Sequence, residues 1–136
     1  MPAARSFRLA AARAAPSSRP DTDTVLTRGN RITRGADYRA VVRGGARCAG
    51  QSTVTHVVST AEQRPPRFGF IVSKHVGGAV VRNTVRRRLK AICAEALPGV
   101  RDGADVVIRA LPSSANAEYS ALRAEVLRCL QRRAAS

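Results

Sequence analysis

The chain has 136 residues, enough for one domain with a modest hydrophobic core. Lys and Arg number 24 against 9 Asp and Glu, and the formal charge of +15 favours a polyanionic partner. Nearly all cations are Arg, whose planar guanidinium binds phosphate and stacks on bases, so nucleic acid is favoured over an acidic protein or a membrane surface. No apolar run approaches the ~20 residues that span a bilayer.

Residues 1–24 are rich in Ala, Arg, Pro and Ser and have no acid before Asp21. Such a segment has nothing to bury, which predicts a disordered basic tail. Its Arg-rich, acid-poor composition also resembles an organelle transit peptide, and a third interpretation is that translation starts later than Met1. The remaining residues, 25–136, are expected to form one RNA-binding domain.

Residues 30–45 are predicted to form a short amphipathic helix that ends at Gly44-Gly45. The β-branched residues of 47–60 predict one strand, and 67–74 predict a second. Alternation along the second strand places Phe68 and Phe70 on one face and Ile71 on the other. Because only a short loop separates these two strands, we expect them to pair as antiparallel neighbours.

A helix is predicted over 79–97, a third strand over 105–110 and a last helix over 117–133. In the last helix one apolar stripe holds Leu122, Val126, Cys129 and Leu130. This order indicates an α+β fold, a compact two-layer sandwich with a small mixed sheet. An N-terminal helix, a central Arg-rich helix and a C-terminal helix would pack on it.

The central helix carries the sharpest functional signal. Its apolar residues fall at helical spacing and predict one buried stripe: Val81, Val85, Leu89, Ile92 and Ala96. One continuous arc on the other side holds Arg82, Asn83, Arg86, Arg87 and Lys90, which we call the basic face. Arg88 falls at the margin of the apolar stripe, where its aliphatic stem would lie past the sheet edge.

Most charge runs are simply solvated surfaces. Here, however, no acidic residue occurs between Arg64 and Ala94, and like charges four residues apart destabilise a lone helix. Solubility alone would be served by mixed charges, and Asn83 adds a donor and acceptor suited to sugar or base edges. We therefore favour a binding surface.

Three cysteines, Cys48, Cys93 and Cys129, lie far apart and form no Cys-x-x-Cys pair. The odd number and the spacing predict reduced, mostly buried thiols in a reducing cytosol and no zinc site. No catalytic constellation can be assembled from two histidines and nine scattered acids, so neither a catalytic nor a metal-ligating residue is predicted in the chain.

The run Phe68-Gly-Phe-Ile-Val-Ser-Lys-His-Val-Gly-Gly-Ala-Val-Val-Arg-Asn-Thr-Val-Arg-Arg-Arg-Leu-Lys90 closely resembles the protein subunit of bacterial ribonuclease P. The family's pattern is a strand, Ser-Lys-Lys, a Val-Gly turn, Ala-Val and an Arg-Asn-Arg helix. The segments 30–45 and 105–112 resemble its opening helix and last strand, so the resemblance covers about residues 26–133.

The resemblance implies the protein subunit of a cytoplasmic endoribonuclease that removes the 5′ leader from precursor tRNA. Expected partners are one catalytic RNA, bound 1:1, and the leader; no membrane is expected. The RNA would carry the hydrolysis and hold Mg²⁺ in the main, the protein alone binding no cofactor. The protein would broaden substrate use and lower the Mg²⁺ requirement. The family also has an unusual left-handed βαβ crossover, against the general right-handed preference.

Carried over residue by residue, the Arg-Asn-Arg motif falls on Arg82, Asn83 and Thr84, so the second Arg is absent. Lys74 matches the first Lys of Ser-Lys-Lys, and His75 replaces the second. The resemblance thus implies an RNA-binding set of Lys74, His75, Arg82, Asn83, Arg86, Arg87 and Lys90. Further basic contacts are expected at Arg31, Arg34, Arg39 and Arg88.

The family's leader cleft lies between the first helix and the sheet. The resemblance places Tyr38, Val42, His56 and Phe70 on it, where aromatic rings could stack on unpaired bases. Core packing is the competing interpretation for Phe70. Family members usually begin near Val25-Leu26, and valine can mark a GUG start, so residues 1–24 could be a misannotated extension that an intact mass would reveal.

Two other classes compete with this interpretation. A non-catalytic RNA-binding protein, such as a ribosomal protein, would have similar size and charge, and the Gly-x-Ala-Val-x-Arg-Asn helix beside a Ser-Lys strand end is what argues against it. A membrane-surface helix protein is disfavoured by the predicted strands and core stripe.

Overall fold

The computed structural model describes residue 26 and residues 28–135; the predicted tail of residues 1–24 lies outside them. Within the described residues four strands form one sheet: β1 (Ala46–Ala49), β2 (Thr53–Ser59), β3 (Arg67–Ile71) and β4 (Ala104–Ala110). The helices of this part of the chain that pack on it are α3 (Gly35–Gly44), α4 (Ala79–Ala96) and α5 (Tyr119–Arg133). Short 3-10 turns are η1 (Arg28–Asn30), η2 (Leu97–Gly99) and η3 (Pro112–Ala115).

The strands lie in the order β1-β2-β4-β3. β1 pairs antiparallel with β2, β2 antiparallel with β4, and β3 parallel with β4. The predicted α+β class and mixed sheet are therefore confirmed. The predicted pairing of the strands at 47–60 and 67–74 is wrong, because β4, from much later in the chain, lies between β2 and β3.

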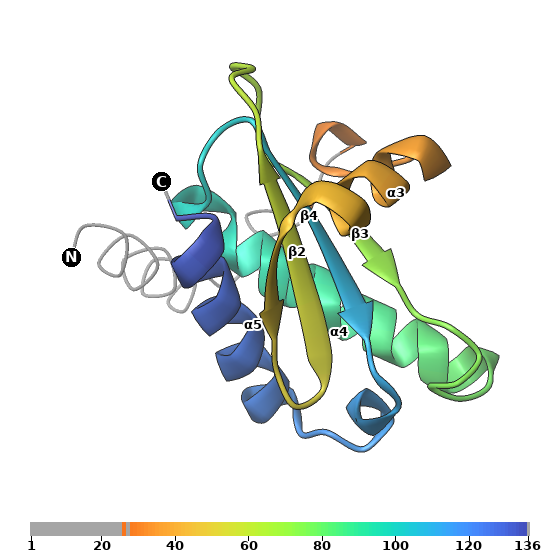
Figure 1. The fold of residues 1–136 in the computed structure, drawn as a ribbon. Helices are drawn as coiled ribbons and strands as arrows, with labels where there is room; N and C mark the ends of the chain where they lie inside the picture. Colours follow the sequence, from red (N-terminus) through yellow and green to blue (C-terminus); the bar gives the residue numbers. More distant parts are fainter. Residues whose placement is uncertain (1–25, 27, 136) are drawn as a thin grey trace.

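α4 connects the parallel strands β3 and β4. In Figure 1 both strands run downward with β3 to the right, and α4 returns behind the sheet, which makes the crossover left-handed. This is the rare hand for a βαβ unit, and it is the one that the resemblance implied.

α4 and α5 cover one face of the sheet and enclose the main core (Figure 1). Val85, Leu89 and Ile92 of α4 are at most 1% exposed, as the predicted stripe requires. Val81 was placed in that stripe wrongly: it is 37% exposed, since the first turn of α4 extends past β3 (Figure 1). The predicted stripe of α5, with Leu122, Val126, Cys129 and Leu130, is buried throughout.

α3 lies on the opposite face of the sheet, where a smaller cluster joins Ile32, Val41 and Val107. The helix predicted over 30–45 starts only at Gly35. Before it, the backbone amide of Ile32 donates to Phe68 O at 2.9 Å, and Asn30 Nδ2 donates to Pro66 O at 3.0 Å. Contacts with the β3 region therefore override helix propensity in this segment.

The strand predicted over 47–60 is instead a hairpin, β1 and β2, with a turn at 50–52. Glu125 of α5 is 7% exposed and holds this turn by accepting hydrogen bonds from the backbone amides of Gln51 and Ser52. A Cβ on Gly50 would lie 2.2 Å from Glu125 Cδ, so a larger residue there would displace the Glu125 side chain that holds the turn.

Cys48 of β1 and Cys129 of α5 form a disulfide, with their Cα atoms 5.7 Å apart. The prediction of three reduced thiols is therefore wrong for this pair. Spacing could not reveal the pair, because 81 residues separate the two positions and only the packing of α5 on the edge strand brings them together. Cys93 is a free, buried thiol whose pKa burial raises far above its usual range.

Candidate nucleic-acid interface

The basic face lies on the side of α4 that turns away from the sheet. Asn83, Arg87 and Lys90 are exposed, while Arg82 and Arg86 are half-buried. Arg86 Nη1 donates to Asn83 Oδ1 at 3.4 Å, and within the described residues no acid pairs with the basic face. Because α4 holds its opposite side in the core, it presents these groups as one rigid row.

The guanidinium of Arg82 has one buried nitrogen, Nε, without a hydrogen-bond acceptor among the described residues. Buried donors are normally satisfied, so an unsatisfied one at the rim of a basic surface indicates a group that an acceptor such as phosphate would complete.

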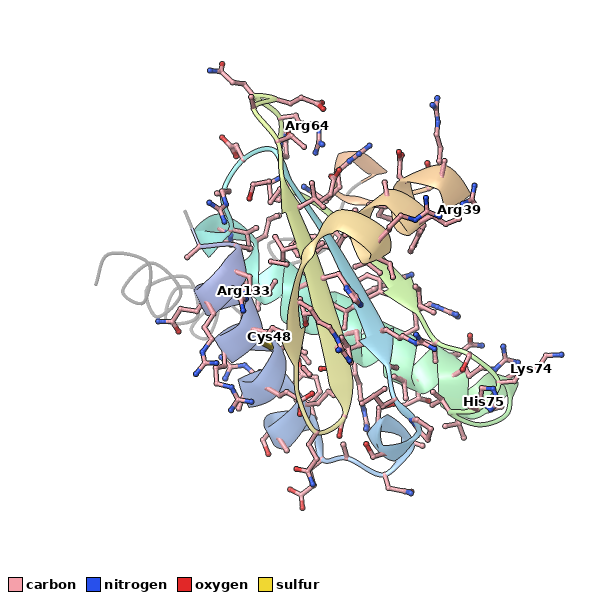
Figure 2. The ribbon with its side chains drawn as sticks, in the orientation of Figure 1. Arg39, Cys48, Arg64, Lys74, His75 and Arg133 are labelled. Carbon is pink, nitrogen blue, oxygen red and sulfur yellow. A yellow bond between two sulfur atoms is a disulfide. The ribbon has the colours of Figure 1, made fainter. Side chains whose placement is uncertain are left out.

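The N-terminal end of α4 extends the basic face. Gly78 caps it without a side-chain hydrogen bond, and the first turn has no acid. Free amides and the helix dipole make such an end favourable for anions. Lys74 and His75 are exposed on the loop before it, and Figure 2 shows both side chains at that end of the molecule. The predicted RNA-binding residues therefore lie together along α4 and its leading loop.

Thr84 and Arg88, next to the basic face, form hydrogen bonds to backbone carbonyls of the protein itself. Thr84, which stands where the family pattern has Arg, donates its hydroxyl to Val80 O at 3.0 Å within its own helix. Arg88 Nη1 donates to Ala117 O at 3.3 Å, in the segment just before α5. Val80 beside them is 80% exposed, which sequence analysis did not anticipate.

A hollow with a volume of about 300 Å³ lies between α3 and the sheet. We call it the sheet groove; it is lined by Tyr38, Arg39, Val42, Arg43 and Ile71. The structure thus brings together two of the predicted cleft residues and adds Ile71 and two arginines. Alternation along β3 had already placed Ile71 on the face opposite Phe68, but only the position of α3 shows that it lines a hollow.

Tyr38 lies directly on the backbone of β3. A Cβ on Gly69 would come within 2.5 Å of the Tyr38 ring, so glycine is what lets the ring approach. The Tyr38 hydroxyl accepts a hydrogen bond from the amide of Phe70 at 3.3 Å. The side chain of Phe70 points to the other face and packs against the main core, so its assignment to the cleft is corrected.

His56 of β2 lies on the same face of the sheet as the sheet groove, two residues before Val58, which packs beneath α3. Arg47 is its partner on β1, and Arg109 lies diagonally across on β4. Burial, then the charges of Arg47 and Arg109, lower the pKa of His56 below its usual value. The imidazole is therefore neutral near pH 7, and its Nδ1 is buried without a partner among the described residues.

The remaining predicted basic residues lie around η1 and α3. Arg31, Arg34 and Arg39 are exposed, and Figure 2 shows Arg39 projecting from α3. Arg31 Nη2 lies 3.5 Å from Leu26 O, a weak internal contact. Arg47 and Arg109 were missed in the sequence, since their position beside His56 depends on the strand order.

No helix in the described part of the chain is long and apolar enough to cross a membrane. Among those same residues, no group of three or more His, Cys, Asp or Glu side chains could hold a metal ion.

Comparison with known proteins gives a consistent result. A sequence model of the family described as Ribonuclease P matches residues 26–134. The ribonuclease P protein component of Clavibacter michiganensis subsp. michiganensis is 44% identical over 108 residues, which cover 79% of this chain and 96% of the relative. That of Acidothermus cellulolyticus is 44% identical over 103 residues, covering 75% and 86%.

Solved structures share the fold. The Staphylococcus aureus RNase P protein superposes with a TM-score of 0.69 at 21% identity, covering 76% of this chain and 94% of that one. The Thermotoga maritima RNase P protein gives 0.67 at 19% identity, covering 75% and 96%.

Proposed function

Because the chain belongs to the ribonuclease P protein family, we propose that it is the protein subunit of a cytoplasmic ribonucleoprotein that removes the 5′ leader from precursor tRNA. The observation that carries the proposal is the basic face of α4, continued by Lys74 and His75, with no acidic residue from Arg64 to Ala94. A rigid row of arginines without counter-charge is suited to the phosphates of a folded RNA.

In this proposal the basic face and the sheet groove bind different RNA segments. The basic face binds the catalytic RNA, one protein to one RNA, and the buried Nε of Arg82 finds its acceptor there. The sheet groove takes the unpaired leader, with Tyr38 and Val42 beside its bases and Arg39 and Arg43 beside its phosphates. His56, neutral near pH 7, extends this surface along β2.

Hydrolysis itself is assigned to the RNA subunit, which also holds Mg²⁺ in the main. The protein's part is to bind and orient the RNA through the basic face and the sheet groove. Arginines that neutralise phosphates replace part of the cation atmosphere, so the protein should lower the Mg²⁺ concentration that the holoenzyme requires.

The test is cleavage of a leader-bearing precursor tRNA by a bacterial ribonuclease P RNA at low Mg²⁺, with and without this protein. The expected result is cutting at the mature 5′ end only when both are present. If the protein binds the RNA without restoring cleavage, the subunit assignment fails and a general RNA-binding role takes its place.

A further inference from the structure

A second cavity, of about 460 Å³, lies where the β1–β2 turn, η3 and α5 meet. We call it the turn groove; the residues that matter here are Gln51, Ser113, Asn116, Ala121, Ala124 and Arg128. In Figure 1 this junction is at the lower end of the molecule, whereas α3, whose residues line the sheet groove, is at the upper end. None of its residues belongs to the basic face or to the sheet groove.

The walls of the turn groove are held rigidly. Glu125 of α5 accepts hydrogen bonds from the backbone amides of Gln51, at 2.9 Å, and Ser52, at 3.1 Å, and from the Thr53 hydroxyl. Ser113 of η3 donates its hydroxyl to Gln51 O at 3.0 Å. Three segments far apart in the chain are thus tied together before any ligand arrives, as in a pre-formed site.

The polar groups at the rim are free to bind. Gln51, Asn116 and Arg128 are exposed, and within the described residues their side chains form no hydrogen bond or ion pair. Each comes from a different segment, so the three converge on one space. Two amides offer paired donors and acceptors, which match the edges of a base, and a guanidinium matches a phosphate.

The surroundings favour a negatively charged ligand with a flat apolar part. The methyl groups of Ala121 and Ala124 give the wall an apolar stretch on which the face of a base can lie. Glu125 is the only acid of α5, is 7% exposed and is occupied by the turn, so no free carboxylate of α5 opposes an anion in the turn groove.

We propose that the turn groove binds an unpaired nucleotide of RNA. Its base lies against Ala121 and Ala124, the amides of Gln51 and Asn116 bind the base edge, and Arg128 binds the adjoining phosphate. The inference rests on the proposed function in taking RNA as the partner, and it adds a point of attachment at the end of the molecule opposite the sheet groove.

The experiment uses the full chain and a bacterial ribonuclease P RNA. Ala121→Leu fills the turn groove without changing charge, and Gln131→Leu places the same side chain on an exposed position of α5 outside the groove. Ala121→Leu should weaken RNA binding about tenfold, the size of one lost base contact. The slope of log affinity against log salt concentration, called the salt slope below, should stay unchanged because no charge is removed. Gln131→Leu should bind as the parent protein does.

A second pair removes the same charge from α5 at two places. Arg128→Ala should reduce the salt slope by about one, and Arg132→Ala should leave base protection in the groove's RNA segment intact. Nucleotide footprinting gives the decisive readout: one short unpaired segment should lose protection with Ala121→Leu and Arg128→Ala, while all other protections stay.

Equal binding and equal footprints for Ala121→Leu and Gln131→Leu would overturn the proposal, as would a loss of protection across the whole RNA. Cleavage by the parent protein at low Mg²⁺ is measured in parallel. Rescue of cleavage with no effect of Ala121→Leu rejects the turn groove alone. A local footprint loss without rescue keeps the turn groove and rejects the subunit assignment.

Discussion

The contact between Tyr38 and Gly69 decides how closely α3 approaches the sheet, and thereby the shape of the sheet groove. The ring occupies the space that any Cβ at position 69 would take, and its hydroxyl is fixed by the amide of Phe70. Sequence could indicate Tyr38 as a cleft residue only through family resemblance. The role of Gly69 was hidden, because it follows from a contact between segments 31 residues apart.

We expect Tyr38→Ala to weaken binding of precursor tRNA to the holoenzyme by roughly five- to tenfold, in line with the loss of one stacked base. Binding of mature tRNA should be unchanged, because it has no leader. Tyr38→Phe is the matched control, since it keeps the ring over Gly69 and loses only the hydroxyl. Equal losses for precursor and mature tRNA would remove Tyr38 from the leader site.

Asp105 gives a second prediction at the residue scale. Burial acts to raise its pKa, but the hydrogen bonds and charges of Arg67 and Arg64 outweigh burial and lower it. A depressed carboxyl pKa stabilises the fold above the unfolded-state value near 4 and loses that contribution as pH falls through the folded-state pKa.

Urea unfolding of the parent protein should therefore show a stability decline below about pH 4, and Asp105→Asn should flatten part of it. Asp102→Asn, at an exposed acid nearby, is the control and should leave the profile unchanged. If the free energy of unfolding fell equally below about pH 4 in the parent and in Asp105→Asn, the effect could not be assigned to this ion pair.

At the scale of elements, periodicity was most reliable where one helix face is fully buried. The stripes of α4 and α5 were predicted closely, with Val81 as the exception at a helix end that extends past the sheet. The N-terminal helix was predicted too long, because the hydrogen bond between Ile32 and Phe68 is a tertiary contact. The β1–β2 hairpin was missed, since its turn is held by Glu125 rather than by a local turn motif.

α4 as an element yields the prediction on salt dependence. Arg82→Ala combined with Arg86→Ala should weaken binding to the catalytic RNA and reduce the slope of log affinity against log salt by about two. Arg132→Ala with Arg133→Ala removes the same charge from the end of α5 and is the matched control. If both double variants lowered affinity and slope alike, the basic face would contribute only its charge and no specific contacts.

At the scale of the whole molecule, the disulfide joins the edge strand β1 to α5 and closes a loop of 81 residues. It constrains the unfolded chain more than any contact within one element could. Spacing of cysteines did not indicate it. Cys93, the remaining thiol, is buried with a raised pKa, so it is not a ready thiolate for exchange with the disulfide.

Reduction of this bond should lower the free energy of unfolding by about 4.5 kcal/mol, the chain-entropy value for such a loop. Thermal unfolding of the parent protein with and without a thiol reductant measures it. Cys48→Ser should unfold like the reduced parent and show no further shift on adding reductant. An unchanged melting temperature of the parent on reduction would mean that the cross-link is dispensable.

The overall class could be predicted because the order of elements and their apolar patterns are local properties of the sequence. The strand order could not, because it depends on β4 inserting between β2 and β3. The same insertion brings Arg109 beside His56, so part of the candidate surface was as unpredictable as the topology itself.

The place of β4 in the sheet has a consequence for synthesis on the ribosome. When the nascent chain has emerged as far as Leu97, β2, β3 and α4 exist in sequence, but the strand that must join them does not. The arginines of α4 are then carried by a helix whose sheet is still incomplete. Productive folding therefore waits for the last quarter of the chain, and the emergence of β4 from the ribosome is the step that lets the sheet reach its native topology.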